Sequence, residues 1–149
     1  MRTFLFACAL ALPALAALPA AIAPAQAQGD VIATRKEGLK RMGAEIEAIK
    51  NSLDRGEPVA PLAARAQAMA GFFQTLPGLF PPGSDQGDTR ARPTVWSDRA
   101  GFETASANMV AALGKLQQAA ASGDAGATAT AFREAGATCG ACHRAYRSR

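Results

Sequence analysis

The residues Cys139–Arg147 read CGACHRAYR and hold the only histidine and the only tyrosine of the 149-residue chain. Two of the three cysteines, Cys139 and Cys142, also stand here, and His143 directly follows the second. Residues i, i+3 and i+4 of a helix share one face, so a helix would bring both thiols and the imidazole to the same side. The stretch therefore predicts a helix with one chemically reactive face.

The spacing C-x-x-C-H is the attachment signature of c-type haem. Cys139 and Cys142 can form thioether bonds with the two haem vinyl groups, while His143 reaches the iron from one side. A structural zinc site normally takes four ligands, and the only other cysteine or histidine is Cys8. A thioredoxin-like dithiol would need a βαβ setting, which the sequence lacks, and a plain disulfide would leave His143 unexplained. The motif therefore indicates one covalently bound haem c.

Residues 1–27 have the features of a secretory signal peptide. A positive charge precedes an apolar stretch over 4–18, and Ala25-Gln26-Ala27 is a small-x-small cleavage site. The alternative is an uncleaved membrane anchor, but prolines interrupt the apolar run and no basic cluster directly follows it. We therefore expect a single mature domain over 28–149, with no membrane span after cleavage. Export agrees with haem attachment, which takes place outside the cytoplasm.

The charge balance is mild. The chain has 16 Lys and Arg against 12 Asp and Glu, a formal net charge of +4. No basic run with interleaved aromatic residues occurs, so the sequence does not indicate nucleic-acid binding.

Proline placement divides the mature chain into helical segments and one loop. We expect helices over 30–57, over about 58–76, and from Ser97-Asp98 onward, since Ser and Asp favour helix N-caps. Gly123-Asp124 breaks the chain, and a further helix is expected after it. A loop rich in glycine and proline, 77–93, separates the second helix from the third. No segment alternates with period two, so strands are not expected. The pattern predicts an all-α antiparallel four-helix bundle with one long crossover loop.

The first helix has a heptad seam with one charged member, Arg35. A buried guanidinium needs an anion, which the propionates of a haem could supply. The alternative is that Arg35 lies near a helix end and extends its charged tip into water. The sequence alone leaves both open. The seam consists of Ile32, Arg35, Leu39, Met42, Ile46, Ile49 and Leu53.

Three segments resemble the cytochrome c′ family, the class II c-type cytochromes, and the resemblance spans essentially the whole mature chain. CGACHRAYR matches the family pattern C-x-x-C-H-x-x-[FY]-R. RPTVWSD, which is Arg92 with 93–98, resembles the segment leading into the third helix. RKEGLKRM, 35–42, resembles the first-helix segment. The resemblance implies a periplasmic monohaem cytochrome that transfers electrons to redox protein partners and binds the gases NO and CO.

Several site residues follow from the resemblance by position. It implies that Arg35 and Lys36 line the haem, with Arg35 near a propionate, and that Asp88 contacts the haem from the long loop. Arg147 would border the pocket on the side of His143. The loop around Asp88 is about two residues longer than the family pattern.

Leu39 falls at the position where the low-spin branch of the family has a methionine ligand. Leucine has no donor atom, so the resemblance implies a five-coordinate, largely high-spin iron with an apolar distal pocket. Met42 is the alternative sixth ligand and would make the protein a six-coordinate low-spin electron carrier. A peroxidase-like enzyme would need a distal histidine, and His143 is the only histidine. We therefore do not expect an enzyme, and haem-dependent catalysis is a remote alternative.

Family members commonly pair through their first two helices, so the resemblance also implies a possible homodimer through 30–57 and 58–76. Ala63, Ala66 and Ala70 would allow close helix approach in such a dimer. Alanine in the core of a single bundle would give the same pattern.

Overall fold

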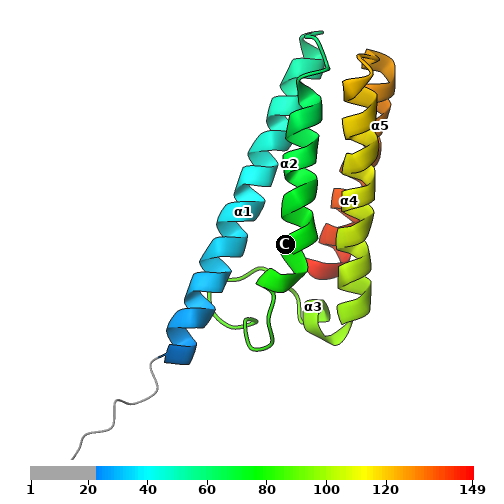
Figure 1. Ribbon diagram of the computed structural model, residues 1–149. Helices are drawn as coiled ribbons and strands as arrows, with labels where there is room; N and C mark the ends of the chain where they lie inside the picture. Colours follow the sequence, from blue (N-terminus) through cyan, green and yellow to red (C-terminus); the bar gives the residue numbers. More distant parts are fainter. Residues whose placement is uncertain (1–22) are drawn as a thin grey trace, which may run out of the picture.

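The computed structural model describes residues 23–149, with side chains from Val31 onward (Figure 1). The predicted signal peptide lies mostly outside the described residues, and its cleavage remains a prediction. Among the described residues, no helix has the length and apolar character needed to cross a bilayer.

Four long helices form the bundle, and α1 and α2 lie beside α4 and α5 (Figure 1). The long connection between α2 and α4 contains two short helical turns, and the described residues contain no strand beyond one isolated bridge. The predicted all-α antiparallel four-helix bundle with one long crossover is confirmed. The elements are α1 (Ala23–Asp54), α2 (Leu62–Thr75), η1 (Leu76–Leu79), α3 (Thr94–Ser97), α4 (Arg99–Ala121) and α5 (Ala125–Tyr146).

Two aspartates begin the third and fourth long helices, as predicted. Asp98 is the N-cap of α4 and accepts a hydrogen bond from Gly101 N at 3.3 Å. Asp124 is the N-cap of α5 and accepts from Ala127 N at 2.9 Å. Each carboxylate satisfies a backbone N–H that the helix itself cannot pair.

The predicted start of the second helix at Pro58 is wrong. The helix α2 begins only at Leu62, and the residues from Pro58 to Pro61 form turns. Pro61 disfavours helical backbone at the residue before it, which delays the helix to the position after Pro61. Val59 in this turn is buried and closes the end of the core.

One end of the bundle has a continuous apolar core, which we call the packed end. Ile49, Leu113 and Leu116 are all fully buried there. Ala66 is buried in the same core, which supports the alternative that alanine spacing in α2 serves the bundle itself. The cluster consists of Ile49, Val59, Leu62, Ala66, Met69, Met109, Leu113, Leu116, Ala120 and Ala131.

The opposite end, which we call the open end, has a smaller aromatic cluster. Phe80 and Phe102 pack edge to face with ring centroids 4.9 Å apart, and the Phe102 and Tyr146 centroids are 5.3 Å apart. Leu76 and Val95 complete the buried part of this cluster. Since it is confined to the long connection and its immediate neighbours, it leaves the space between α1 and α5 unfilled.

The long connection is fastened to the C-terminal end of α5 by backbone pairing. Ala91 and Arg147 form an antiparallel bridge. Arg92 N donates to Tyr146 O at 2.9 Å, and Ser148 N donates to Arg90 O at 2.8 Å. The connection therefore ends directly beside the CGACHRAYR segment.

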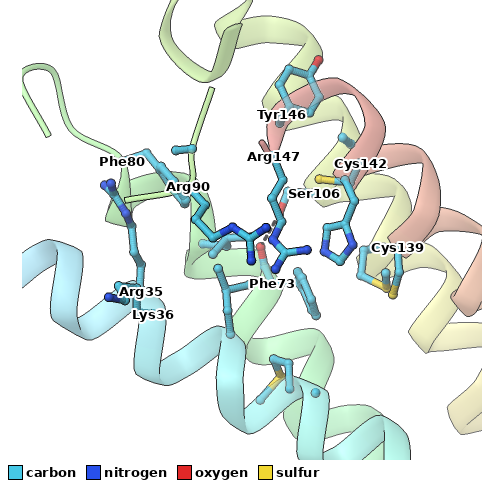
Figure 2. A pocket seen from close by; sticks show the side chains of 18 of the residues that line it. Arg35, Lys36, Phe73, Phe80, Arg90, Ser106, Cys139, Cys142, Tyr146 and Arg147 are labelled. Carbon is cyan, nitrogen blue, oxygen red and sulfur yellow. Dashed lines mark hydrogen bonds between the residues drawn. The ribbon is translucent and has the colours of Figure 1, made fainter. Parts of the chain in front are cut away.

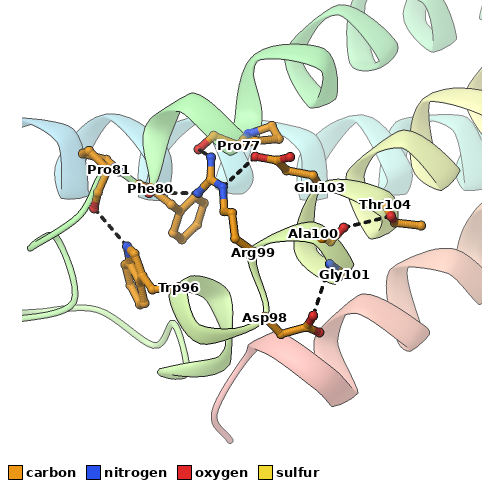
Figure 3. A network of polar contacts seen from close by, with 10 residues as sticks. All are labelled: Pro77, Phe80, Pro81, Trp96, Asp98, Arg99, Ala100, Gly101, Glu103 and Thr104. Atoms are coloured by element: carbon orange, nitrogen blue, oxygen red, sulfur yellow. Dashed lines mark hydrogen bonds and ion pairs between the residues drawn. The ribbon is translucent and has the colours of Figure 1, made fainter.

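A second set of polar contacts holds the other side of this connection (Figure 3). Arg99 donates to Phe80 O at 3.0 Å and to Pro77 O at 2.7 Å, and it pairs with Glu103 at 2.7 Å. Trp96 Nε1 donates to Pro81 O at 2.9 Å. These bonds tie backbone carbonyl groups of the long connection to α3 and α4, and they fix the position of Phe80.

Candidate functional site

A cavity of about 560 Å³ opens between the four long helices at the open end. Figure 2 shows α1 on one side of it and the two cysteines of α5 on the other. The walls are predominantly apolar, and all four long helices contribute to them. The side chains that matter below are Arg35, Lys36, Leu39, Met42, Phe73, Phe80, Arg90, Phe102, Ser106, Met109, Cys139, Cys142, His143, Tyr146 and Arg147.

The α5 wall brings together the three residues of the motif. Cys139 and Cys142 are half-buried free thiols, and both line the cavity with His143. Burial raises the pKa of both thiols, since an apolar setting disfavours the thiolate. The pKa of His143 is lowered, first by burial and then by the positive charge of Arg147. The imidazole is therefore kept neutral, with a lone pair available to a metal ion.

The α1 wall presents Leu39 to the cavity. Leu39 is 37% exposed, and it is the only exposed large hydrophobic residue among those the structure describes. Met42, one turn further along α1, also lines the cavity, but it is half-buried and packs against the core of the packed end. Leu39 is therefore the more accessible of the two side chains, and it offers no donor atom.

Arg35 is buried, with 2% of its surface exposed. Its guanidinium donates to Ser84 Oγ at 2.8 Å, to Ser84 O at 2.7 Å and to Thr89 Oγ1 at 2.7 Å. A fourth bond reaches Leu79 O at 3.3 Å, and the group lies 4.4 Å from the centroid of the Phe80 ring. Burial lowers the pKa of Arg35. The interpretation that Arg35 extends its tip into water is wrong, because the long connection folds over α1 and covers it.

These bonds give Arg35 a structural task at the edge of the cavity. Its four acceptors are neutral oxygens, and three of them belong to Ser84 and Thr89 of the long connection. The arginine thus ties the connection to α1, and its proximity to a propionate stays a prediction.

Lys36 and Asp88 form an ion pair across the mouth of the cavity. Lys36 lines the cavity, whereas Asp88 is not among the lining residues and reaches the site only through this pair. The hydrogen bond and charge of Lys36 lower the pKa of the Asp88 carboxyl. Both side chains are exposed, so the pair orders the loop more than it adds stability.

Sequence reasoning missed Arg90 and much of the aromatic lining. Figure 2 shows Arg90 of the long connection and Arg147, which directly follows α5, extending into the cavity. The pairing of 90–92 with the end of α5 places Arg90 there, and no helical periodicity could have indicated it. Tyr146, whose hydroxyl donates to Asp98 at 2.8 Å, stands within the quoted motif and could have been included.

The geometry fits a haem. The cavity is apolar, two thiols and a neutral imidazole lie on one of its walls, and cations stand at its mouth. A disc-shaped apolar group with two carboxylates matches this distribution of surface and charge.

Comparisons with known proteins agree with this geometry. The family model for cytochrome c′ matches residues 30–147. Cytochrome c′ of Allochromatium vinosum is 32% identical over 154 residues, which cover 100% of both chains. The crystal structure of cytochrome c′ from Thermochromatium tepidum superposes with a TM-score of 0.76 at 29% identity, covering 82% of this chain and 97% of that one.

A further solved structure is the nitric oxide complex of a leucine-to-alanine variant of cytochrome c′ from Alcaligenes xylosoxidans. It superposes with a TM-score of 0.74 at 28% identity and covers 82% of this chain and 96% of that one.

Proposed function

Because this chain belongs to the cytochrome c′ family, whose cofactor is haem c, we propose that it is a periplasmic monohaem cytochrome with a five-coordinate iron. In this proposal the protein carries electrons and binds NO and CO. The observation that carries it is Leu39, an exposed apolar side chain without a donor atom that lines the cavity together with His143.

The residues of α5 hold the cofactor in this proposal. Cys139 and Cys142 form the two thioether bonds to one haem c, and His143 is the axial iron ligand. The lowered pKa of His143 supports this role, because only the neutral imidazole has a lone pair to donate. The half-buried thiols lie on the wall of the cavity that receives the disc.

When bound, the haem supplies a one-electron couple and a coordination position for a diatomic gas. The chain's own residues decide which gas can use it. Leu39 crowds that position and donates no hydrogen bond, and Met42 beside it has no N–H or O–H group either. Bound dioxygen benefits from a hydrogen-bond donor, whereas NO and CO do not require one. Leu39 therefore favours NO and CO.

Four further site residues are proposed to act at the edge of the haem. Arg35 holds the long connection over α1, and Lys36 with Asp88 orders the loop at the mouth of the cavity. Arg147 lowers the pKa of His143 through its charge and borders the same side of the cavity.

The test is an absorption spectrum of the purified holoprotein in the ferric state, after reduction, and after addition of NO. We expect high-spin spectra in both oxidation states and a new spectrum with NO. A methionine–iron charge-transfer band in the ferric protein would show that Met42 binds the iron and would overturn the five-coordinate proposal. Two matched variants support the measurement. Met42→Leu should leave the spectrum unchanged, and Leu39→Met should convert the protein to a low-spin form.

We also propose a homodimer through α1 and α2, on the family resemblance alone. Ala66 does not support it, because this residue is buried within the chain's own core. Sedimentation of the holoprotein at micromolar concentration tests it, and a single monomeric species would overturn it.

A further inference from the structure

Five arginines gather where the long connection meets the C-terminal end of α5. The bridge between Ala91 and Arg147 brings the two segments together, and Arg92 Nη1 donates to Arg144 O at 2.9 Å. All five side chains are exposed. We call this group the arginine cluster, and it consists of Arg90, Arg92, Arg144, Arg147 and Arg149.

No carboxylate neutralises the arginine cluster within the described part of the chain. The ion pairs found there involve six other basic residues, and none includes a member of the cluster. Asp98, a nearby acidic residue, accepts from Tyr146 and caps α4. Two haem propionates and one terminal carboxylate would still leave a surplus of positive charge among five arginines.

The cluster surrounds the haem-binding segment. Arg90 and Arg147 line the cavity itself (Figure 2). Arg144 folds back along α5, with Nη1 3.3 Å from the position that a Cβ on Gly140 would occupy. Gly140 lies between the two cysteines, so this guanidinium lies against the turn that carries the thioether bonds.

We propose that the arginine cluster is the docking surface for an acidic redox protein, and that electrons enter and leave the haem at this edge. The inference rests on the proposed electron-transfer function. Redox encounters between proteins bury little surface, and opposite charges speed them by steering the approach. An uncompensated cluster of cations next to the cofactor provides such steering.

An acidic protein fits this surface better than an anionic membrane. Peripheral membrane binding combines basic residues with apolar side chains that enter the lipid. Among the described residues, the only exposed large hydrophobic one is Leu39, which lines the cavity and is not part of the cluster. The cluster therefore has charge without an apolar anchor.

The first experiment tests whether the surface around the haem is positively charged, by comparing the rates at which an anionic and a cationic complex reduce the iron. Ferric holoprotein is mixed in a stopped-flow instrument with [Fe(EDTA)]²⁻ or with [Ru(NH₃)₆]²⁺. Each complex gives one electron to the ferric iron and is itself oxidised, and no covalent bond forms or breaks. We expect the rate with the anion to fall as salt is added and the rate with the cation to rise, since salt screens exposed charges.

Variants assign the effect to the cluster. The double variant Arg144→Gln/Arg149→Gln should slow the anionic reductant by roughly three- to tenfold at low ionic strength, because it removes two of the five charges and full electrostatic steering raises rates by roughly ten- to a thousandfold. Arg144→Lys should retain the rate. Arg133→Gln is the matched control, because Arg133 lies on α5 about 15 Å before His143 by helical rise and is exposed and without an ion pair. It should change the rate much less.

The second experiment uses a protein as the reductant. Flavodoxin hydroquinone, whose surface around the flavin is acidic, gives one electron to the ferric iron and is tested with the same variants. Equal rates for wild type and the double variant with both [Fe(EDTA)]²⁻ and flavodoxin would overturn the docking proposal and leave electron transfer intact. Failure of the haem iron to be reduced by any of the three reagents would instead overturn the proposed function. A third outcome is that wild type cosediments with vesicles of anionic lipid and the double variant does not, while both react equally fast with flavodoxin. This outcome would show that the cluster binds a membrane and not an acidic protein.

Discussion

The two ends of the bundle are built from the same four helices but held together differently. At the packed end, Ile49 of α1 is fully buried against α2 and α4. At the open end, Leu39 of the same helix is 37% exposed and lines a cavity of about 560 Å³. The helix α1 therefore serves as a core element over one part of its length and as the wall of a binding site over another.

The comparison shows that one continuous apolar seam can pack into a core at one end of a helix and line a binding cavity at the other. The packed end is stabilised by burial of aliphatic side chains. The open end is held by arginines that donate to neutral oxygens: Arg35 ties the long connection to α1, and Arg99 binds the carbonyls of Pro77 and Phe80. The polar framework preserves the space into which the apolar cofactor fits.

The largest expected effect comes from preventing haem attachment. In the variant Cys139→Ser/Cys142→Ser, the cavity of about 560 Å³ would lose the apolar disc that covers its predominantly apolar walls, and those walls would be exposed to water. We expect the open end to lose its structure, measured by hydrogen exchange of the purified variant.

Each single variant, Cys139→Ser or Cys142→Ser, serves as a control because it keeps one thioether bond. If residues around Phe80 kept full protection from hydrogen exchange in the haem-free double variant, the open end would not depend on the haem for its structure, which contradicts this expectation.

The next effect concerns the packed end. Leu113→Ala removes a fully buried side chain and should lower the free energy of unfolding by about 2–5 kcal/mol. The haem spectrum should not change, because Leu113 does not line the cavity. Denaturant unfolding of the holoprotein measures the first expectation, and a shifted spectrum would show that the two ends are coupled.

A somewhat smaller effect is expected for Arg35 at the open end. Arg35→Met leaves the buried Ser84 without its arginine donors and should lower the free energy of unfolding by about 2–4 kcal/mol. Faster exchange should be confined to the residues of the long connection. Lys36→Met is the control, since Lys36 is exposed and should have little effect. Equal losses in both variants would argue against the structural task of Arg35.

Leu39→Ala should change stability by less than about 1 kcal/mol, because this side chain is partly exposed to the cavity. Its kinetic effect should be large. Carbon monoxide should bind the reduced variant at least roughly tenfold faster than wild type, since the crowding group is removed; each tenfold corresponds to about 1.4 kcal/mol of barrier. Stopped-flow rates that stay unchanged would show that Leu39 does not lie over the iron.

The smallest effect is the acid dependence of the ion pair at the mouth of the cavity. Lys36 lowers the pKa of Asp88, so the folded protein binds fewer protons there than the unfolded chain. The contribution to stability is complete above the unfolded value of about 4 and is lost as the pH falls through the depressed folded value. Asp88→Asn should weaken the dependence of the free energy of unfolding on pH in this acidic range. Denaturant unfolding at several pH values measures this dependence.

Glu57 offers the matched control at the packed end, because its pKa is lowered in the same direction by Arg55. Glu57→Gln should flatten the same pH range, but without altering hydrogen exchange around the cavity. If hydrogen exchange around the cavity changed in both Asp88→Asn and Glu57→Gln, the two ends of the bundle would not respond separately to loss of a carboxylate.

Much of the fold was predictable because it rests on local signals. Asp98 marked a helix start through cap chemistry, Gly123-Asp124 marked the break before α5, and the heptad spacing marked the seam of α1. The spacing of Cys139, Cys142 and His143 likewise predicted that they share one wall of the cavity. The start of α2 was misplaced because Pro58 was interpreted as a first-turn proline, whereas the helix begins only after Pro61.

The rest depended on contacts between distant parts of the chain. Arg35 meets its partners Ser84 and Thr89 in a loop whose path no periodicity describes. Arg90 enters the cavity only because its neighbours pair with the end of α5. The sequence could indicate that a core arginine needs acceptors, but it could not say that carbonyl and hydroxyl groups would satisfy it.

The pairing of the long connection with α5 has a consequence for how the protein is made. The cysteines follow α1, α2 and α4 in the chain, so these helices leave the ribosome first. Residues 90–92 can find their partners only when the end of α5 arrives. The site therefore closes last, and the thiols of Cys139 and Cys142 can be reached for haem attachment before the connection pairs with α5.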